Sequence, residues 1–511
     1  MVHVEGKVGR LAARSLSWAA NKEERVPAAK ALLESLKHEE WDKGWLDSHV
    51  ALETHFNDED QSSKAIDYAS QARYYMGSTI QTFVETVVRA AEGGEMETWL
   101  PGLKGVTFEV VRGQGDATPF AEGAGPGKVC VVLGAGNQNF LTAVDALNRI
   151  FVNGECVLIK HHPLRPWLME PYKKMFAPLI ELDVLDQVLD EDFDRKVLAD
   201  PRVGHVHLTG SEATFAAVKK SVGPGTTVSG ELGCVTPWIA LPGAWTSKEL
   251  QTAARMLVAA KKANGGANCI SPQVLVMTRG WGQRDEFIAE IRASLTAIPD
   301  AKAYYPGARE RRDDFLRRYG VERADDDDAV ALVEILHEED DYALQHEVFG
   351  PFLAVVDVED PVAFVNSKVK GSLTCTVLAP QVSGDPADVL EALNYGTVAQ
   401  NTWSVFGYPA MCRGGTWGAH PPGDSSGRGT LGNHFGIEPF LDKTIVYAGD
   451  LAKPPVDFAT PVPAIVYDAL FVATLRTGGF AATRVAALLF RRLLSTIPGL
   501  FGYKRTPADL S

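Results

Sequence analysis

The sequence predicts an α/β protein with two units, each a mostly parallel sheet covered by helices. From residue 128 onward, short apolar runs such as Lys128–Leu133 and Cys156–Ile159 alternate with helical segments such as 140–151. Strands that alternate with helices in this way form parallel sheets. A second alternation of the same kind spans about 235–430. Its expected strands are 238–241, 273–277, 353–358 and 374–378.

The first hundred residues are expected to be helical. Apolar residues recur at three- and four-residue spacing in 28–36 and 66–91, which is the pattern of amphipathic helices. Trp41, Trp45 and Trp99 are expected to pack between these helices. A supporting bundle is the interpretation that this periodicity favours.

Composition excludes several classes of protein. The 511 residues are 45% hydrophobic and 23% charged, as in ordinary soluble chains of several domains. A formal net charge of -15 argues against nucleic-acid binding, because phosphates require clustered Lys and Arg. The segment Met1–Arg25 has no apolar run of signal-peptide length, and no run is long enough to span a membrane.

Cysteine and acidic residues give no sign of a metal site. Six cysteines without a C-x-x-C pair form neither a disulfide framework nor a zinc motif, so a reduced, cytoplasmic setting is expected. The four aspartates at 325–328 lack the spaced ligands, the glycine and the distal Glu of a calcium loop. We therefore expect no metal.

Ligands of parallel α/β sheets bind beyond the carboxyl ends of the strands. In the first unit these ends carry Asn137, Lys160 and Thr209-Gly210-Ser211. A helix that starts after Gly210 and Ser211 offers free backbone N–H groups to a phosphate, although most helix starts bind only their own cap. The Gly134-x-Gly136 turn is not the G-x-G-x-x-G dinucleotide motif, because residue 139 is Asn.

The stretch Asn264–Cys269 (NGGANC) is the strongest candidate for chemistry in the chain. Its two glycines allow close approach of the backbone and leave room for a substrate beside the thiol. A free cysteine alone is weak support, since most are buried and inert. Its significance rises with three further motifs, which are Leu208–Ser211, Glu231-Leu-Gly and Glu347–Pro351.

Taken together and in this order, the motifs resemble those of the NAD(P)-dependent aldehyde dehydrogenase superfamily. The resemblance covers about 100–450 and identifies a divergent branch. It implies a helical N-terminal region with a Rossmann-like cofactor domain at 1–232 and a catalytic α/β domain at 233–432. It also implies a bridging segment at 433–450, joined by Val106–Arg112, that pairs with a neighbouring subunit, so a homodimer or homotetramer is expected.

The resemblance also implies roles for the three central residues. Cys269 would attack an aldehyde carbonyl as the thiolate, giving a thiohemiacetal and then a thioester. The side-chain amide of Asn137 and the backbone N–H of Cys269 would hold the oxyanion. Glu231 would activate the water that releases the acid.

The cofactor implied is NAD or NADP. Lys160 would bind the adenosine ribose, and Glu347 the nicotinamide ribose. Phe349 would pack beside the nicotinamide, and the helix start at Gly210 and Ser211 would hold the pyrophosphate.

Departures from the family pattern leave the cofactor and the substrate open. Cys234 stands where many members have a second glycine, and Gly134–Gly136 replaces residues that include Trp and Pro. Lys160 is followed by His161-His162-Pro163, whereas NAD-preferring members often have a Glu three residues on. Its absence permits NADP, which a charged His161 or His162 would favour, and two surface histidines are an equal interpretation.

Two alternative activities follow from the same motifs. Acylating relatives pass the acyl group to coenzyme A, or reduce an acyl-CoA to the aldehyde, and they typically lack the deacylating Glu, so Glu231 favours water. A non-catalytic scaffold of the same fold is the other alternative. Cys269, Glu231 and Asn137 together argue against it.

The tail, 451–511, lies beyond the resemblance. Its segment 481–494 is expected to form an apolar helix that bears arginines. Such a helix could lie on a membrane surface, but packing on the body or on a partner subunit is favoured.

Overall fold

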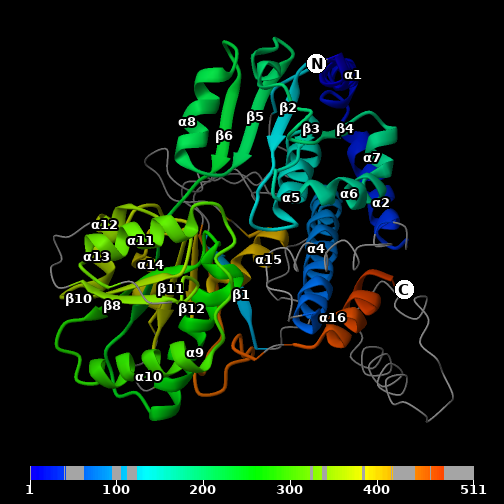
Figure 1. Ribbon diagram of the computed structural model, residues 1–511. Coiled ribbons are helices and arrows are strands. Elements are labelled where there is room, and N and C mark those ends of the chain that lie inside the picture. The colour runs from blue at the N-terminus through cyan, green and yellow to red at the C-terminus, as the bar shows by residue number, and fades with distance from the viewer. Residues whose placement is uncertain are drawn as a thin grey trace.

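The computed structural model describes residues 2–38, 41, 62–94, 105–111, 123–322, 326–335, 342–381, 386–415, 417, 443–460 and 462–476. Two sheets dominate it, a smaller one near the top of Figure 1 and a larger one at the lower left. The expected regions Trp45, Trp99, Asp325, 427–442 and 481–494 lie outside these ranges.

The smaller sheet has five parallel strands in the order β4-β3-β2-β5-β6. Their bounds are β2 Val129–Leu133, β3 Cys156–Lys160, β4 Leu185–Val188, β5 Val203–Thr209 and β6 Thr227–Glu231. The order reverses direction between β2 and β5. In such sheets the crevice beside the carboxyl ends of these two strands receives the ligand.

Strands β4 and β6 were not singled out from the sequence. Both are short and carry polar residues, with Asp186 and Gln187 in β4 and Ser229 and Glu231 in β6. Neither therefore shows the continuous apolar run of a buried parallel strand. Their pairing with β3 and β5 is a long-range event that local pattern does not encode.

Helices surround the smaller sheet on both faces. They are α1 Val2–Trp18, α2 Arg25–Leu36, α5 Leu141–Leu147, α6 Met169–Met175, α7 Ala177–Glu181 and α8 Glu212–Ser221. α6 and α7 are separated at Phe176, where the chain leaves the helical conformation, and Pro178 lies in the first turn of α7. The short turns of this part are η1 Lys22–Glu24, η3 Asn148–Val152, η4 Pro166–Leu168 and η5 Arg195–Ala199.

The larger sheet has eight strands in the order β1-β13-β12-β11-β7-β8-β10-β9. All neighbours are parallel except β1 and β13. The bounds are β1 Thr107–Val111, β7 Thr236–Ala240, β8 Pro272–Thr278, β9 Ala331–Ile335, β10 Phe352–Val358, β11 Thr374–Leu378, β12 Thr397–Gln400 and β13 Lys443–Tyr447.

Helices cover this sheet on both sides, with α9 and α10 below it in Figure 1 and α11 to α14 above. The bounds are α9 Ser247–Lys262, α10 Arg284–Ala297, α11 Ala308–Arg318, α12 Tyr342–Gln345, α13 Pro361–Lys368, α14 Ala387–Ala392 and α15 Gly407–Cys412. The remaining short turns are η6 Ala263–Gly266, η8 Ser404–Phe406 and η9 Val472–Arg476.

The expected bridging strands lie in this chain's own sheet. β13 pairs in parallel with β12, and β1 pairs antiparallel with β13 from Thr107↔Tyr447 to Val111↔Lys443. The hydroxyl of Tyr447 donates to the carboxylate of Glu109 at 2.5 Å. The residues expected to pair with a neighbouring subunit therefore also pair with one another in this chain, as strands of its larger sheet. β1 lies inside the range 1–232 but belongs to this sheet, while the expected boundary at 232/233 falls between β6 and β7.

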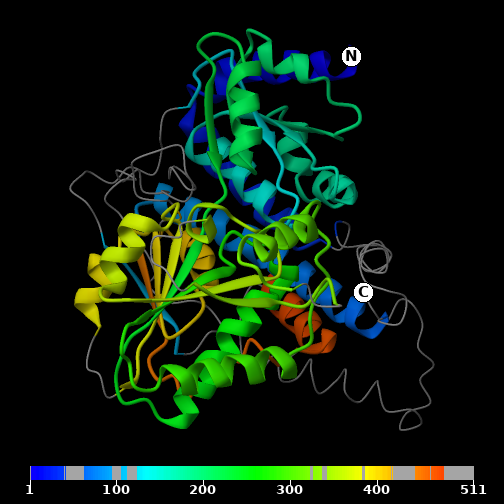
Figure 2. The same ribbon diagram turned by 60° about the vertical axis from the view of Figure 1, so that its left-hand side comes forward.

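A long helix joins the two halves of the molecule. α4 (Ser62–Ala91) packs against α2, α5, α15 and α16 (Ala464–Phe471), as Figures 1 and 2 show. Arg73 of α4 and Asp468 of α16 form a buried ion pair at 2.6 Å. The described start of the tail thus packs on the body of the protein. Within the described ranges, none of the helices combines the length and the apolar character that crossing a membrane requires.

Candidate active site

The loop before Cys269 has a backbone that only small residues permit. Asn264, Gly265 and Gly266 have backbone φ angles of 57°, 61° and 75°. These angles lie in the left-handed region, which residues with a Cβ rarely adopt, although Asn does so more often than most. A Cβ on Gly266 would lie 2.5 Å from the carbonyl oxygen of Gly350. The two glycines therefore let the nucleophile loop pack directly on the Glu347–Pro351 segment.

Side-chain amides connect this loop to the end of β2. The amide of Asn137 donates to the carbonyl of Ala267 at 3.1 Å, and the amide of Asn264 donates to the carbonyl of Asn137 at 3.0 Å. Gln138 donates to the side-chain oxygen of Asn268 at 2.6 Å. An Asn side chain has two N–H donors, so Asn137 keeps one beyond its bond to Ala267. The two sheets thereby meet beside Cys269.

Cys269 is only partly exposed, and its surroundings disfavour the thiolate. Burial raises the pKa of the Cys269 thiol, and the Glu347 and Glu231 carboxylates raise it further. Against this, the backbone N–H groups of Cys269 and Ile270 are directed at the sulfur and lower its pKa. The hydroxyl of Thr236 holds the carbonyl of Cys269 at 2.7 Å. Cys269 is therefore held in place by its backbone, its thiol is protonated at neutral pH, and two backbone N–H groups face its sulfur.

Glu231 is the last residue of β6, and its carbonyl accepts the N–H of Gly210 at 2.9 Å. Burial raises the pKa of its carboxyl well above the ordinary value, and Asp145 of α5 adds to this shift. Its Oε2 is buried and finds no hydrogen-bond partner among the described residues. A carboxyl held in this way suits a general base that must first lose a proton.

The Glu347 carboxyl lies beside Gly233, which is in the connection between β6 and β7. Burial raises its pKa to about 8, although Arg311, the backbone N–H of Cys234 and Lys261 act in the opposite direction. Gly233 permits this approach, because a Cβ there would fall 2.4 Å from Oε2 of Glu347. Burial also lowers the pKa of Lys261 to about 7.

Phe349 follows Glu347 closely and is strained. Its φ is 46°, which is unusual for a residue with a large side chain. Its ring meets that of Tyr305 edge-on, with centroids 4.8 Å apart. Strain of this kind is found at ligand-binding segments that the surrounding structure holds in place.

Lys160, Gly210 and Ser211 lie at neighbouring strand ends of the smaller sheet. Lys160 ends β3 and forms an ion pair with Asp190, which follows β4. Ser211 caps the exposed start of α8, where its hydroxyl accepts the N–H of Thr214 at 3.1 Å. Gly210 and Ser211 follow β5, one of the two strands whose carboxyl ends border the crevice of this sheet, and Lys160 ends the strand next to β2.

The two histidines after Lys160 are not a charged surface pair. His161 is buried and bonded to Gln187 at 2.7 Å. Burial lowers the pKa of both His161 and His162 to about 4, and in His162 the positive charges of Lys160 and Arg165 add to the effect. Both rings are therefore neutral at pH 7 and supply no charge for a 2′-phosphate.

Three residues near the site were missed in the sequence. Asp145, Tyr408 and Lys261 are all buried, and the hydroxyl of Tyr408 has no hydrogen-bond partner in the described part of the chain. Burial raises the pKa of Tyr408, and Asp145, Glu231 and Cys269 are close enough to contribute. The available signal was a polar residue inside an apolar helical segment, as in LTAVDAL around Asp145.

Comparison with known proteins gives matches to one group. Residues 69–305 match the model of the aldehyde dehydrogenase family. Alpha-ketoglutaric semialdehyde dehydrogenase of Acinetobacter baylyi is 28% identical over 239 residues, which are 41% of this chain and 43% of that protein. The chain thus aligns with less than half the length of this relative.

Solved structures extend the match across the chain. NADP-dependent glyceraldehyde-3-phosphate dehydrogenase from Bacillus halodurans has a TM-score of 0.61 at 14% identity, covering 87% of this chain and 91% of that one. Aldehyde dehydrogenase C from Pseudomonas syringae, solved with NAD⁺ and octanal, has a TM-score of 0.60 at 16% identity and 90% coverage of both. The fold is therefore that of the aldehyde dehydrogenases. The family model that matches residues 69–305 belongs to the same group.

Proposed function

We propose that the protein oxidises an aldehyde to a carboxylic acid, with NAD(P) as hydride acceptor. The observation that carries this proposal is the convergence of Cys269, Asn137 and Glu231 where the two sheets meet. Each comes from a different segment, yet the Asn137 amide bonds to the Cys269 loop and the Glu231 carboxylate acts on the Cys269 thiol. A nucleophile, an oxyanion donor and a base are the groups that this chemistry requires.

The residues divide the reaction between them. The Cys269 thiol gives its proton to water, and its sulfur bonds to the aldehyde carbon as the carbonyl π electrons move to the oxygen. The remaining N–H of Asn137 and the Cys269 N–H face this oxyanion. A bound NAD(P) supplies the acceptor for the hydride that leaves this carbon. Glu231 then takes a proton from water, which attacks the thioester and frees Cys269.

The acylating alternative is disfavoured by Glu231. Its carboxyl is buried close to Cys269, and an unpartnered oxygen there is ready to bind a water molecule. A scaffold without turnover is disfavoured by Phe349, whose φ of 46° is costly for a large side chain, since such strain persists where function requires it.

We further propose that NAD is preferred to NADP. The sequence has no Glu three residues after Lys160, but Asp190 takes the corresponding place beside it. Asp190 follows β4, the neighbour of β3, and forms an ion pair with Lys160. A carboxylate at this position accepts a ribose hydroxyl and repels a 2′-phosphate. Neutral His161 and His162 offer no compensating charge.

The assembly and location are also proposals. β1 and β9 are the two edges of the larger sheet among the described strands, and an edge strand such as β1 offers backbone groups to a second copy. This supports a homodimer or homotetramer. All six cysteines are free thiols, which fits a reducing compartment such as the cytoplasm.

The activity is tested by absorbance of reduced nicotinamide with NAD or NADP, a panel of aldehydes, and coenzyme A present or absent. Reduction without coenzyme A that Cys269→Ala abolishes is the expected result. Cys156→Ala, a buried thiol in β3, is the matched control and should retain activity. Reduction only with coenzyme A would establish the acylating reaction instead.

Glu231→Gln distinguishes the two acyl acceptors. If water is the acceptor, this variant should release one equivalent of reduced cofactor and then stall, with the acyl group retained on Cys269. Intact-protein mass spectrometry detects that group as added mass. Full turnover of the variant in the absence of coenzyme A would contradict the role of Glu231.

A further inference from the structure

One face of the smaller sheet carries a line of polar side chains. His205, His207 and Thr209 alternate along β5, so their side chains share a face. Beside them on β6, Ser229 pairs with His207 and Glu231 with Thr209. Strands in the middle of parallel sheets are normally apolar on both faces, because unpaired polar groups are costly to bury. This line, the polar line, runs along the strands and ends at Glu231.

Ser229 joins the two histidines. Its hydroxyl lies 2.8 Å from Nδ1 of His207 and 2.7 Å from Nε2 of His205. A hydroxyl donates one hydrogen bond and accepts others, so it can donate to one ring and accept from the other. Both histidines are buried, with 5% of His205 and 3% of His207 exposed.

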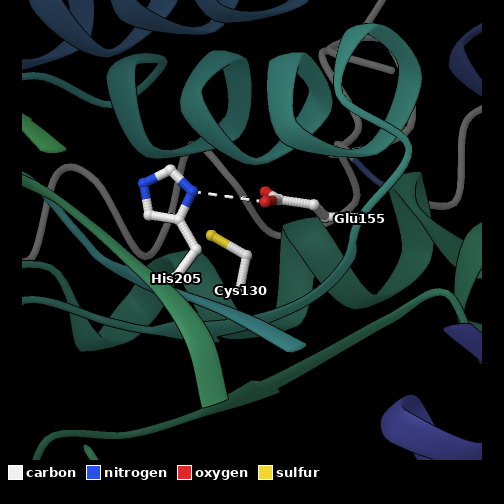
Figure 3. A group of neighbouring side chains, drawn as sticks. All are labelled: Cys130, Glu155 and His205. Atoms are coloured by element: carbon white, nitrogen blue, oxygen red, sulfur yellow. Dashed lines mark hydrogen bonds and ion pairs between the residues drawn. The ribbon is translucent and has the colours of Figure 1, made fainter. Parts of the chain in front are cut away.

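The far end of the polar line is a closed ion pair. Nδ1 of His205 lies 3.2 Å from Oε1 of Glu155 (Figure 3), and Arg149 bonds both carboxylate oxygens at 2.6 and 2.8 Å. Cys130, Glu155 and His205 bring possible ligand atoms within 4.8 Å of one another. The Arg149 guanidinium, bonded to Glu155 and His205, already supplies the positive charge there. We therefore do not interpret this cluster as a metal site.

The other end of the polar line, at Glu231, has buried polar atoms that lack hydrogen-bond partners among the described residues. Oδ2 of Asp145 accepts the hydroxyl of Thr209 at 3.1 Å, and its Oδ1 lies 3.7 Å from Nε2 of His207. Neither Oδ1 nor Nε2 has a hydrogen-bond partner within the described residues, and the same holds for Oε2 of Glu231. A small rotation would bring Asp145 and His207 into a hydrogen bond. Tyr408, Cys269 and Cys412 are further titratable groups at this end.

We propose that Asp145 and His207 form a proton relay behind Glu231, an inference that rests on the proposed dehydrogenase function. The proton that Glu231 takes from water passes by way of the Asp145 carboxylate to Nε2 of His207. Glu231 becomes anionic and His207 cationic, so the net charge of the three groups is unchanged and no electron moves. The cation then pairs with Asp145, which converts two unpartnered atoms into a charged hydrogen bond. Asp145 and His207 are thus positioning residues that act through Glu231.

The kinetic test uses Asp145→Asn and His207→Asn with stopped-flow detection of reduced nicotinamide. The initial burst of reduced nicotinamide should keep its rate, because hydride transfer precedes hydrolysis of the thioester. The steady-state rate should fall about tenfold. The double variant should be no slower than the slower single variant, since residues acting as a unit are not additive. Asp186→Asn is the control, as this carboxylate of β4 bonds Lys7 and Arg10 at the far edge of the sheet.

A second measurement does not depend on turnover. The His207 ring resonance, assigned by its loss in His207→Asn, is followed by NMR as the pH is lowered. Asp145→Asn should displace this resonance, because the ring loses the carboxylate that faces its Nε2 at 3.7 Å. Far-UV circular dichroism establishes that each variant is folded.

The outcomes separate the two hypotheses. A wild-type protein that reduces no cofactor would count against the dehydrogenase function. A wild-type protein that turns over while His207→Asn retains its steady-state rate would overturn the relay alone. A His207 resonance that is insensitive to Asp145→Asn would also overturn it, whatever the kinetics.

Discussion

The side chain of Asn137 donates to the carbonyl of Ala267, two residues before Cys269, and so joins the end of a strand in one sheet to the nucleophile loop of the other. The contact is buried, with 7% of Asn137 exposed. It fixes the distance between an amide donor and the thiol before any substrate arrives. Preorganisation of this kind is what makes an oxyanion donor effective.

Asn137→Ala should therefore lower kcat by about 100-fold or more, the usual loss for one oxyanion donor. Binding of the cofactor, measured by calorimetry, should change little, since Asn137 holds the reacting end of the site. The thermal midpoint serves as the control for folding. A variant with wild-type kcat would remove Asn137 from the mechanism.

The reactivity of Cys269 should rise with pH. Burial, Glu347 and Glu231 raise its pKa, so the thiol form dominates at neutral pH and the thiolate appears as the pH increases. Glu347→Gln removes one negative charge and should move the alkylation profile of Cys269 to lower pH, by on the order of one unit. Glu359→Gln, an exposed acid bonded to Arg279, is the control. Coincident profiles would show that Glu347 does not act on the thiol.

Asp190→Asn should shift cofactor preference toward NADP. The change removes the carboxylate that pairs with Lys160 and so frees this lysine for a 2′-phosphate. The ratio of kcat/KM for NADP to that for NAD should rise about tenfold. Asp192→Asn, an exposed acid in the same loop, should leave the ratio unchanged. An equal ratio in both variants would mean that Asp190 does not face the ribose.

Gly266→Ala should destabilise the protein. Its φ of 75° is unfavourable for alanine, and the new Cβ would lie 2.5 Å from the carbonyl oxygen of Gly350. The two effects should lower the free energy of unfolding by about 2 kcal/mol or more, seen as a lower thermal midpoint. Gly282→Ala, where a Cβ meets nothing within 4 Å, is the matched control. Equal midpoints would show that the loop relaxes without cost.

Sequence alone predicted the two α/β units and the segments that carry Asn137, Glu231, Cys269 and Glu347. It could do so because each segment has a local signature of small residues or an apolar strand. The parts that it did not predict depend on neighbours distant in the chain. Asp190 lies in an acidic stretch that looks like a solvated loop, and it gains significance only because β4 pairs with β3.

The polar line gave a signal that was present but ambiguous. His205 and His207 alternate within an expected strand, which is also the pattern of a strand with one solvated face. Only the β5–β6 register and the position of α5 show that this face is buried and that it leads to Glu231. The pairing of β1 with β13, and of β13 with β12, is likewise not visible in the sequence, because it depends on the order of strands in the folded sheet.

The pairing of β1 with β13 has a consequence for synthesis. Glu109 and Tyr447, which bond across these strands, are 338 residues apart. On the ribosome the smaller sheet is complete once β6 has emerged, and domains generally fold in this order. β1, although made earlier, must wait as an unpaired strand until β13 has been made. A chaperone that binds extended segments would find its target there during that interval.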